Sequence, residues 1–440
     1  MRIQTAVWRV EDFLRHSSHV RNLNAIFLVA RAYASNVEAV AARHLSRALA
    51  FSENPALSRR ITASIMKRFP PEFTQGTWRQ VVEDIPNYRK ILESDPQLTR
   101  SILLKAPGLN GEKGVLLLYF EYNWIRLICG LSDSEFDWFN HHFDVILSTS
   151  WSPTDYAALA LFLGKTTGAV FVQPCNHAER EKLEGLHPRI VALDSMPCDW
   201  INPAFYTKKD QERPIDFLMV ANWGGFKRHI DFFEALRYLP KKLRVVLVGQ
   251  KEAGRDSEYI INLAKRLGVP QALEVHQSIP IEKVSELQEE AKVSLIFSRR
   301  EGCCVAAVES LFAGCALGMR SDAHVGPLDY INEKTGLRLR PGHIAEDLRR
   351  LLEISGSFDP SSWAAGEVSC HITHQKLNQS MEEAAQVGGR PWTRDLVLPQ
   401  WRPYPQYVNM EDAEEMRPAY EELHERSPRV FPRSGDWTAK

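Results

Sequence analysis

Apolar residues recur at helical spacing at the start of the chain and gather into short unbroken runs further on. In residues 33–51, one face of a predicted helix carries Val37, Val40, Ala41, Leu45 and Leu49. Residues 77–94 show a similar pattern, and prolines divide this part of the chain into short pieces. The pattern predicts a helical region over residues 1–110.

Four continuous apolar runs follow, at residues 114–120, 144–150, 169–175 and 189–195. Apolar runs without polar alternation are typical of strands that are buried on both faces, as in a parallel sheet covered by helices. We therefore expect a Rossmann-like domain over residues 111–206.

The charged stretch "YTKKDQERP" at 206–214 is predicted to be a linker, after which the pattern restarts. Six strand candidates with helical segments between most of them predict a doubly wound domain over 215–355. These strands are expected at 216–222, 244–250, 272–277, 293–298, 315–320 and 336–341. The remaining tail, 356–440, contains one predicted helix at 410–426 and is expected to pack back on the N-terminal half.

Composition narrows the class of protein. With 54 basic against 55 acidic residues in 440, no excess of positive charge favours nucleic acid as a partner. Seven scattered cysteines do not resemble a secreted disulfide framework and favour a reducing compartment. No run of eighteen apolar residues is present. We expect a soluble, cytoplasmic protein, and peripheral contact with a membrane stays open.

The stretch "VANWGGFKRH" at 220–229 ends the first strand of the second predicted domain. In doubly wound sheets, ligands bind outside the carboxyl ends of the strands. Gly224 and Gly225 allow the backbone to approach a ligand closely, and Lys227 and Arg228 bring two positive charges to the start of a helix. This combination predicts an anion site.

The stretch "EGCCVAAVE" at 301–309 follows the fourth strand, at the same edge of the sheet. Glu301 is expected in the loop and Glu309 one to two turns into the next helix, so both carboxylates can face one pocket. Small residues between them would let backbone N–H groups reach an anionic ligand; these are Gly302, Cys303, Cys304 and Val305, with two alanines after them.

Two other patterns are weaker. "GQKEAGRD" at 249–256 has the glycine spacing of a phosphate-binding P-loop, but Arg255 and Asp256 stand where a lysine and a hydroxyl residue belong. Cys370, His371 and His374 have tolerable spacing for metal ligands but no clear fourth ligand. We expect no metal site and no cofactor.

Together the two strand-end motifs resemble the donor-binding domain of retaining family-four glycosyltransferases, which have the GT-B fold. The resemblance covers about 216–350 and includes "ESLFAGCALGMRSD" and "DYINEKTGLRLRPGH". It implies two Rossmann-like domains facing a cleft, with Lys227 and Arg228 holding the donor diphosphate. It also implies that Glu301 contacts the transferred sugar and Glu309 the ribose. Many members carry Arg where this chain has Asn222, so Lys227 and Arg228 must carry more of the charge.

The first Rossmann-like domain is expected to bind the acceptor through residues at its strand ends. The candidates are Glu121, Asn123, Ser150, Trp151, Asn176 and His177. The resemblance thus implies transfer of a sugar from a nucleotide-diphosphate-sugar to a hydroxyl of a glycan or another acceptor, with retention of configuration. Two alternatives stay open: a binding protein without catalysis, and an epimerase or phosphorolytic enzyme on the same fold.

Overall fold

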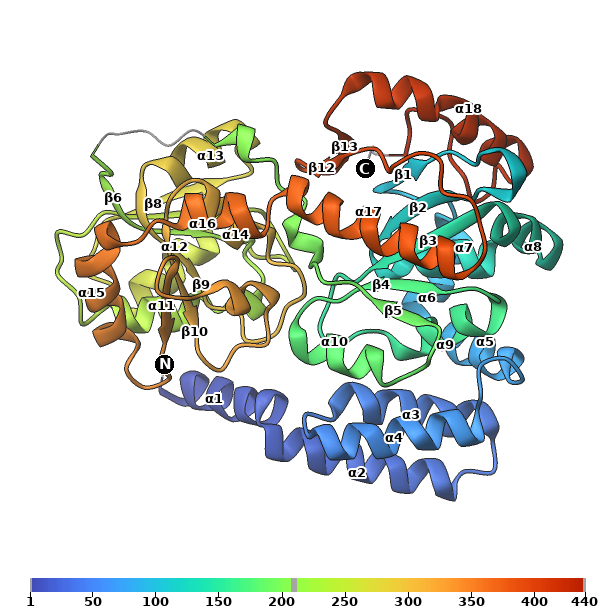
Figure 1. Ribbon diagram of the computed structural model, residues 1–440. Coiled ribbons are helices and arrows are strands. Elements are labelled where there is room, and N and C mark those ends of the chain that lie inside the picture. The colour runs from blue at the N-terminus through green and yellow to red at the C-terminus, as the bar shows by residue number, and fades with distance from the viewer. Residues whose placement is uncertain (1, 207–211, 438–440) are drawn as a thin grey trace. The chain divides into compact units, whose positions relative to one another are not determined.

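A computed structural model describes residues 2–206 and 212–437, which form two compact units (Figure 1). The first unit comprises Arg2–Pro197 and His374–Lys440, and the second comprises Cys198–Thr373. Residues 207–211 of the predicted linker lie outside the described residues.

The second unit contains a six-stranded parallel sheet in the order β11-β10-β9-β6-β7-β8. Its strands are β6 (Ile215–Val220), β7 (Val245–Gly249), β8 (Leu273–Gln277), β9 (Ala291–Ile296), β10 (Ala316–Arg320) and β11 (Gly336–Leu339). All six lie where the apolar runs predict strands. The chain order reverses between β6 and β9, which is the switch point of a doubly wound sheet.

Helices connect these strands and cover the sheet. They are α11 (His229–Leu236), α12 (Ser257–Leu267), α13 (Ile281–Glu289), α14 (Val305–Phe312), α15 (Ile344–Ile354) and α16 (Pro360–Glu367). α14 ends where predicted, because Gly314 takes a left-handed conformation (φ +80°) just after it.

The first unit contains a five-stranded sheet in sequence order, and β2 to β5 are parallel. The strands are β1 (Ser101–Lys105), β2 (Gly114–Tyr119), β3 (Phe143–Ser148), β4 (Val170–Gln173) and β5 (Ile190–Ala192). The four predicted strands are present. β1, which the pattern did not predict, pairs antiparallel with β2 at the edge.

Six helices precede this sheet and confirm a helical N-terminal region, which ends at Ser94 and not at the predicted residue 110, because β1 already belongs to the sheet. They are α1 (Arg2–His16), α2 (Ser18–Ala34), α3 (Glu38–Phe51), α4 (Pro55–Arg68), α5 (Gln75–Glu83) and α6 (Pro86–Ser94). The helices between the strands are α7 (Glu121–Gly130), α8 (Asp133–His142), α9 (Tyr156–Lys165) and α10 (His177–Glu184). The expected α/β class, with two Rossmann-like parts and an extra helical region, is confirmed.

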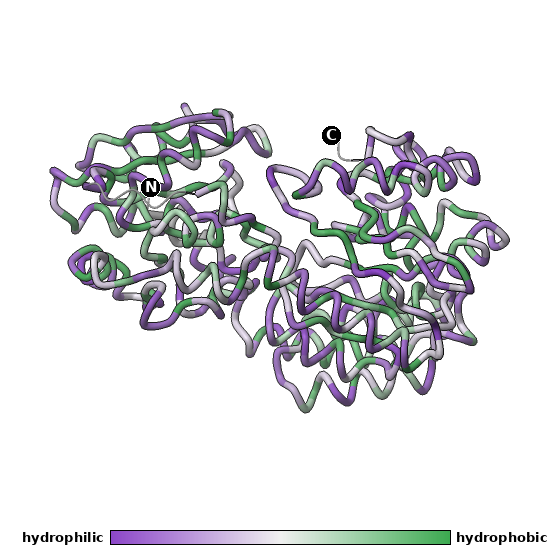
Figure 2. Tube along the Cα trace, turned by 45° about the horizontal axis from the view of Figure 1, so that its top comes forward, coloured by the Kyte–Doolittle hydropathy of each residue, from purple (hydrophilic) through white to green (hydrophobic). Residues whose placement is uncertain are grey.

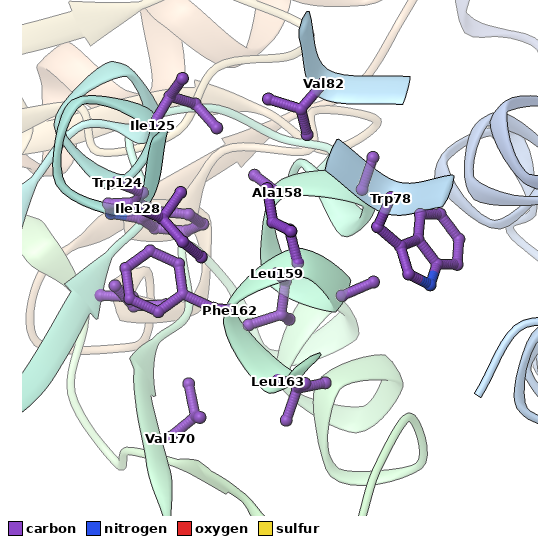
Figure 3. Close-up of a cluster of buried hydrophobic side chains, with 14 of the residues drawn as sticks. Trp78, Val82, Trp124, Ile125, Ile128, Ala158, Leu159, Phe162, Leu163 and Val170 are labelled. Carbon is purple, nitrogen blue, oxygen red and sulfur yellow. The ribbon is translucent and has the colours of Figure 1, made fainter. Parts of the chain in front are cut away.

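α9 lies at the centre of the first unit. Its residues from Tyr156 to Gly164 are all buried, because α3, α5 and α7 pack around it. Figure 3 shows Trp78 and Val82 of α5 near α9, together with Trp124 of α7. A helix that is apolar on every side must be covered on every side, so the N-terminal helices belong to this core.

The chain after residue 373 returns to the first unit. It forms α17 (Cys370–Val387), β12 (Pro399–Trp401), β13 (Pro405–Tyr407) and α18 (Met410–Arg426), the last at the bounds predicted. The Tyr420 hydroxyl accepts from the Leu103 N–H (2.9 Å), and the Tyr407 hydroxyl donates to the Leu103 carbonyl (2.8 Å). Figure 2 shows apolar stretches inside the units and polar stretches on the outer helices.

A buried ion pair also fixes this returning segment. Lys105 Nζ lies 2.6 Å from Glu112 Oε1, and each side chain is 2% exposed. Thr393 donates to the same carboxylate from its N–H (2.7 Å) and its hydroxyl (2.6 Å), while Lys105 lies 3.3 Å from the ring centroid of Trp392. Burial opposes ionisation of Glu112, but the hydrogen bonds from Lys105 and Thr393 outweigh it and lower the pKa to about 2.

Glu112→Gln should lower the free energy of unfolding at neutral pH by about 3 kcal/mol, because it leaves Lys105 buried without a counter-charge. The contribution of ionised Glu112 is complete above its ordinary pKa of 4.5, and it is lost as the pH falls from there through about 2. Urea unfolding across this pH range measures both effects. Glu83→Gln, in the exposed pair with Arg79, is the control and should cost about 0.5 kcal/mol or less. Equal losses for the two variants would contradict the prediction.

Candidate functional site

The two sequence motifs meet at the carboxyl edge of the second unit's sheet. β6 pairs directly with β9, so the loop after β6 (221–228) and the loop after β9 (297–304) begin on neighbouring strands. These two strands flank the switch point, where doubly wound sheets bind their ligands. The strand order thus brings Lys227 and Glu301 together, although 74 residues separate them in sequence.

The Lys227 ammonium forms an ion pair with the Glu301 carboxylate, and each side chain is only 12% exposed. Burial opposes the charge on Lys227, but the neighbouring Glu301 carboxylate outweighs it and raises the pKa of Lys227. The ring centroid of Phe226 lies 5.2 Å from the ammonium. Lys227 is therefore a fixed positive charge at the strand ends.

Several buried oxygens in the loops after β6, β7 and β9 have no hydrogen-bond partner among the described residues. They are Oδ1 of Asn222, Oε2 of Glu252, Oε2 of Glu301 and Oγ of Ser298. Buried polar atoms are nearly always paired, so a group of unpaired ones marks a place where a ligand supplies the missing partners. Three of these oxygens belong to carboxylate or amide groups and can only accept a hydrogen bond. The matching ligand must therefore supply several hydrogen-bond donors, as a molecule rich in hydroxyl groups does.

Arg228 holds an unusual backbone conformation, with φ at +58°, at the start of α11. Its guanidinium makes two bonds to Asp231, of 2.6 and 3.1 Å, and Asp231 also accepts from Arg320 (2.8 Å). A left-handed conformation of a non-glycine residue is strain of the kind that gathers at functional sites. The structure thus fixes Arg228 beside Lys227, with Asp231 holding its side chain.

Glu301 lies in the loop before α14 and Glu309 within that helix, where 8% of its surface is exposed. Cys304 is the N-cap residue of α14 and makes no side-chain cap bond. Burial, followed by the charge of Glu301, raises the pKa of the Cys304 thiol to about 12, so it stays protonated. Gly302 is buried and Cys303 half-buried between them. The absence of a side-chain cap leaves the start of α14 suited to an anion.

The loop after β7 adds two residues to this edge of the sheet: Glu252, which the sequence patterns did not single out, and Arg255, which they placed only in a P-loop-like stretch. Glu252 and Arg255 close a tight turn through mutual backbone hydrogen bonds of 3.0 and 2.9 Å. A Cβ on Gly224 would lie 2.6 Å from Glu252 Oε2, and a Cβ on Gly225 would overlap the Arg255 guanidinium. The two glycines therefore make room for a carboxylate and a cation from the neighbouring strand. The signal that could have identified Glu252 and Arg255 in the sequence was their position just after β7.

The P-loop-like glycines do not form a phosphate loop. The Asp256 side chain caps α12 by accepting from the Tyr259 N–H at 3.0 Å, which fills the place that an anion would take. Nearby, burial and the charges of Lys227 and Arg255 lower the pKa of His229 to about 3, so its imidazole is neutral. In the tail, His374 Nε2 bonds to the Leu396 carbonyl at 2.7 Å.

The first unit has a pocket of about 520 Å³ at the carboxyl ends of β2 and β3. Glu121 and Trp151, both predicted on the acceptor side, line it, and helices α3, α5 and α6 contribute the opposite wall. Ser150 donates to the Glu121 carboxylate from its N–H (3.0 Å) and its hydroxyl, and burial raises the pKa of Glu121. Phe120, just before Glu121, has φ at +70°.

Three features of this pocket suit a ligand. Thr154 is 2% exposed and its Oγ1 has no hydrogen-bond partner among the described residues, whereas Trp151 is 42% exposed. Arg47 is exposed, and no carboxylate of the described residues forms an ion pair with it. Arg43, by contrast, pairs with Asp84 at 3.1 Å.

The other acceptor-side candidates lie elsewhere. Asn176 is the N-cap of α10, where its side chain accepts from the Glu179 N–H at 2.9 Å, and His177 is the exposed first residue of that helix. Asn123 is fully buried and bonds to the backbone of Thr99 and Tyr119. The structure therefore brings Glu121 and Trp151 together but places Asn176, His177 and Asn123 outside the pocket.

The family model of group 1 glycosyl transferases matches residues 205–358, the stretch that carries β6 to β11 and both strand-end loops. Residues 205–358 are a group 1 glycosyltransferase domain. The predicted family resemblance is confirmed for this domain. The two motifs also lie where they were expected, in the loops after the first and the fourth strand of its sheet. No curated protein sequence matches the chain.

Solved glycosyltransferase structures resemble the chain distantly. AviGT4, a glycosyltransferase involved in avilamycin A biosynthesis, is 18% identical over 49% of this chain and 64% of its own, with a TM-score of 0.38. Sucrose-phosphate synthase from Thermosynechococcus elongatus is 14% identical over 72% of this chain and 81% of its own, with a TM-score of 0.47. HepE of Anabaena, solved with UDP, is 12% identical over 61% of this chain and 78% of its own, also with a TM-score of 0.47. The match thus spans less than two thirds of AviGT4.

Among the helices of residues 2–206 and 212–437, none has the length and apolar content that crossing a bilayer requires.

The buried pair of the glycosyltransferase domain should behave as a coupled unit. Lys227→Met and Glu301→Gln should each lower the free energy of unfolding by about 3 kcal/mol, since each leaves one charge buried alone. The double variant should lose less than the sum, with a coupling energy of about 2 kcal/mol, measured by urea unfolding of all four proteins. The exposed pair Lys283–Glu286, changed in the same way, is the control and should show almost no coupling. Additive losses at Lys227 and Glu301 would contradict the ion pair.

Proposed function

We propose that this protein is a retaining glycosyltransferase that moves a sugar from a nucleotide-diphosphate-sugar to a hydroxyl acceptor. In this reaction the bond between the anomeric carbon and the diphosphate breaks, and a bond from the same carbon to the acceptor oxygen forms. A nucleoside diphosphate and the proton of the acceptor hydroxyl are released. The family of the domain supports the class of reaction.

The unpaired buried oxygens at the ends of β6, β7 and β9 carry this proposal. Asn222, Glu252 and Glu301 offer acceptor atoms to hydroxyl groups, while Lys227 lies against Glu301. A ligand that pairs with these acceptor oxygens and with the Lys227 ammonium must carry several hydroxyls and a negative charge, as a nucleotide-diphosphate-sugar does. We assign the transferred sugar to Glu301 and the ribose to Glu309.

The diphosphate is assigned to the cations and to the uncapped helix starts. Lys227 and Arg228 follow β6, and neither α11 nor α14 has a side-chain N-cap bond. Stabilisation of charge on the leaving diphosphate is the main catalytic effect that such an arrangement offers. Arg255 adds a third cation next to Gly225, which compensates for the neutral Asn222 in the position where many family members have Arg.

The acceptor is assigned to the pocket over β2 and β3. An exposed indole can cover the apolar face of a sugar, and Glu121 and Thr154 offer oxygen atoms to its hydroxyls. This assignment gives the helical N-terminal region a direct part in binding, because α3, α5 and α6 form one wall.

Loss of the third cation should weaken donor binding. Arg255→Ala should raise the dissociation constant for the nucleotide-sugar about tenfold or more, because a charge-assisted contact to phosphate is lost. Thermal shifts with UDP-, GDP-, ADP- and dTDP-sugars identify the donor first and then measure the effect. Arg266→Ala, at the exposed end of α12, is the matched control. An unchanged thermal shift for Arg255→Ala would remove Arg255 from the site, and no shift with any donor would overturn the proposed function.

Removal of the indole should affect the acceptor alone. Trp151→Ala should raise KM for the acceptor about tenfold, since a stacking surface is lost, while the donor thermal shift stays the same. Tyr404→Ala, which removes a similarly exposed aromatic ring of the same unit, is the control. It should leave both the KM for the acceptor and the donor thermal shift unchanged. Product release without any acceptor would favour an epimerase or phosphorolytic enzyme, and donor binding without turnover would favour a binding protein.

A further inference from the structure

The first two helices, α1 and α2, expose large apolar side chains. Of the sixteen large hydrophobic residues that are exposed among the described side chains, nine lie between residues 10 and 40. The main group, which we name the apolar face, consists of Val10, Phe13, Leu14, Leu23, Ile26 and Phe27, each more than half exposed. Monomeric soluble proteins rarely gather so many exposed large apolar side chains in one segment unless the segment binds something.

The exposed and buried positions of α2 lie on opposite sides of the helix. Arg21, Ala25, Leu28 and Ala32 are buried. α2 packs on α3, and Figure 1 shows α2 as the outer member of that pair. Leu23, Ile26 and Phe27 recur at helical spacing on the other side, where the described part of the chain supplies no cover. The apolar face is therefore a surface and not part of the core.

The charge of the N-terminal helices indicates what covers the apolar face. The first 68 residues carry eleven Lys and Arg against four Asp and Glu, whereas the whole chain is balanced at 54 against 55. The exposed charged residues of α1 and α2 include Arg15 and Arg31 as well as Glu11, and α4 adds the exposed Arg59, Arg60 and Lys67. Arg31 lies 5.9 Å from the ring centroid of Phe27, so a cation borders the apolar face directly.

We propose that α1 and α2 dock on an anionic lipid surface. Helices that lie in a membrane interface combine an apolar face with flanking Lys and Arg, and the cations are attracted to acidic headgroups. Long arginine side chains reach the headgroups while the aromatic and aliphatic residues enter the acyl boundary. A second copy of this chain would bring the same excess of positive charge to the contact, which disfavours self-association through this face.

Co-sedimentation of the full chain with vesicles tests the proposal. The protein should bind vesicles of phosphatidylcholine and phosphatidylglycerol in equal parts, should not bind phosphatidylcholine alone, and should be released by added salt. The triple variant Phe13→Ser, Leu23→Ser, Phe27→Ser should bind at least about tenfold more weakly, because three apolar anchors are lost.

A matched triple variant controls for general loss of apolar surface. Phe73→Ser, Val387→Ser, Met410→Ser changes three residues that are also highly exposed but lie away from the apolar face, and it should bind like the unaltered protein. Circular dichroism should show both variants folded. Two results would overturn the proposal: no binding of the unaltered protein to acidic vesicles, or equal binding of both triple variants. Conversion of a dimer to a monomer by the first variant, without vesicle binding, would assign the apolar face to a second copy instead.

Discussion

The parallel pairing of β6 with β9 is the contact on which the candidate donor site depends. The two strands are far apart in sequence, and their ladder joins Ile215 to Ala291 and Phe217 to Val293. Once that ladder forms, the loops after both strands must open at one edge, and a cation from one meets a carboxylate from the other. β7, on the other side of β6, adds its own loop to the same place. The chemistry of the site is therefore a consequence of strand order.

The sequence predicted this unit well because its strands are unambiguous. β6, β7, β9 and β10 are buried on both faces, so they appear as unbroken apolar runs, and parallel order follows from the helices between them. β1 escaped prediction because five residues at an antiparallel edge, ending in Lys105, give too short a signal. α17 escaped because its polar residues and its position in a tail of mixed composition hide its helical pattern.

The site was predictable in its parts but not in its partners. Lys227, Arg228, Glu301 and Glu309 follow strands, so their edge of the sheet could be foreseen. That Lys227 pairs with Glu301, or that Arg320 reaches Asp231, depends on side-chain packing between different strands, which no local pattern records. Arg255 stands in the sequence where a P-loop would have its lysine, and only the approach of its guanidinium to Gly225 gives it a place in the site. On the acceptor side, a strand-end position alone could not separate a capping Asn176 from a pocket-lining Trp151.

The burial of α9 on every side also shows how far the first unit depends on its N-terminal helices. In a Rossmann-like unit without the N-terminal helices, the side of this helix facing away from the sheet would meet water and would carry polar residues. Here that side is apolar from Tyr156 to Gly164, and α3 and α5 cover it. Without α3 and α5, this side of α9 would meet water, so a unit cut back to its sheet and inner helices would expose part of its own core.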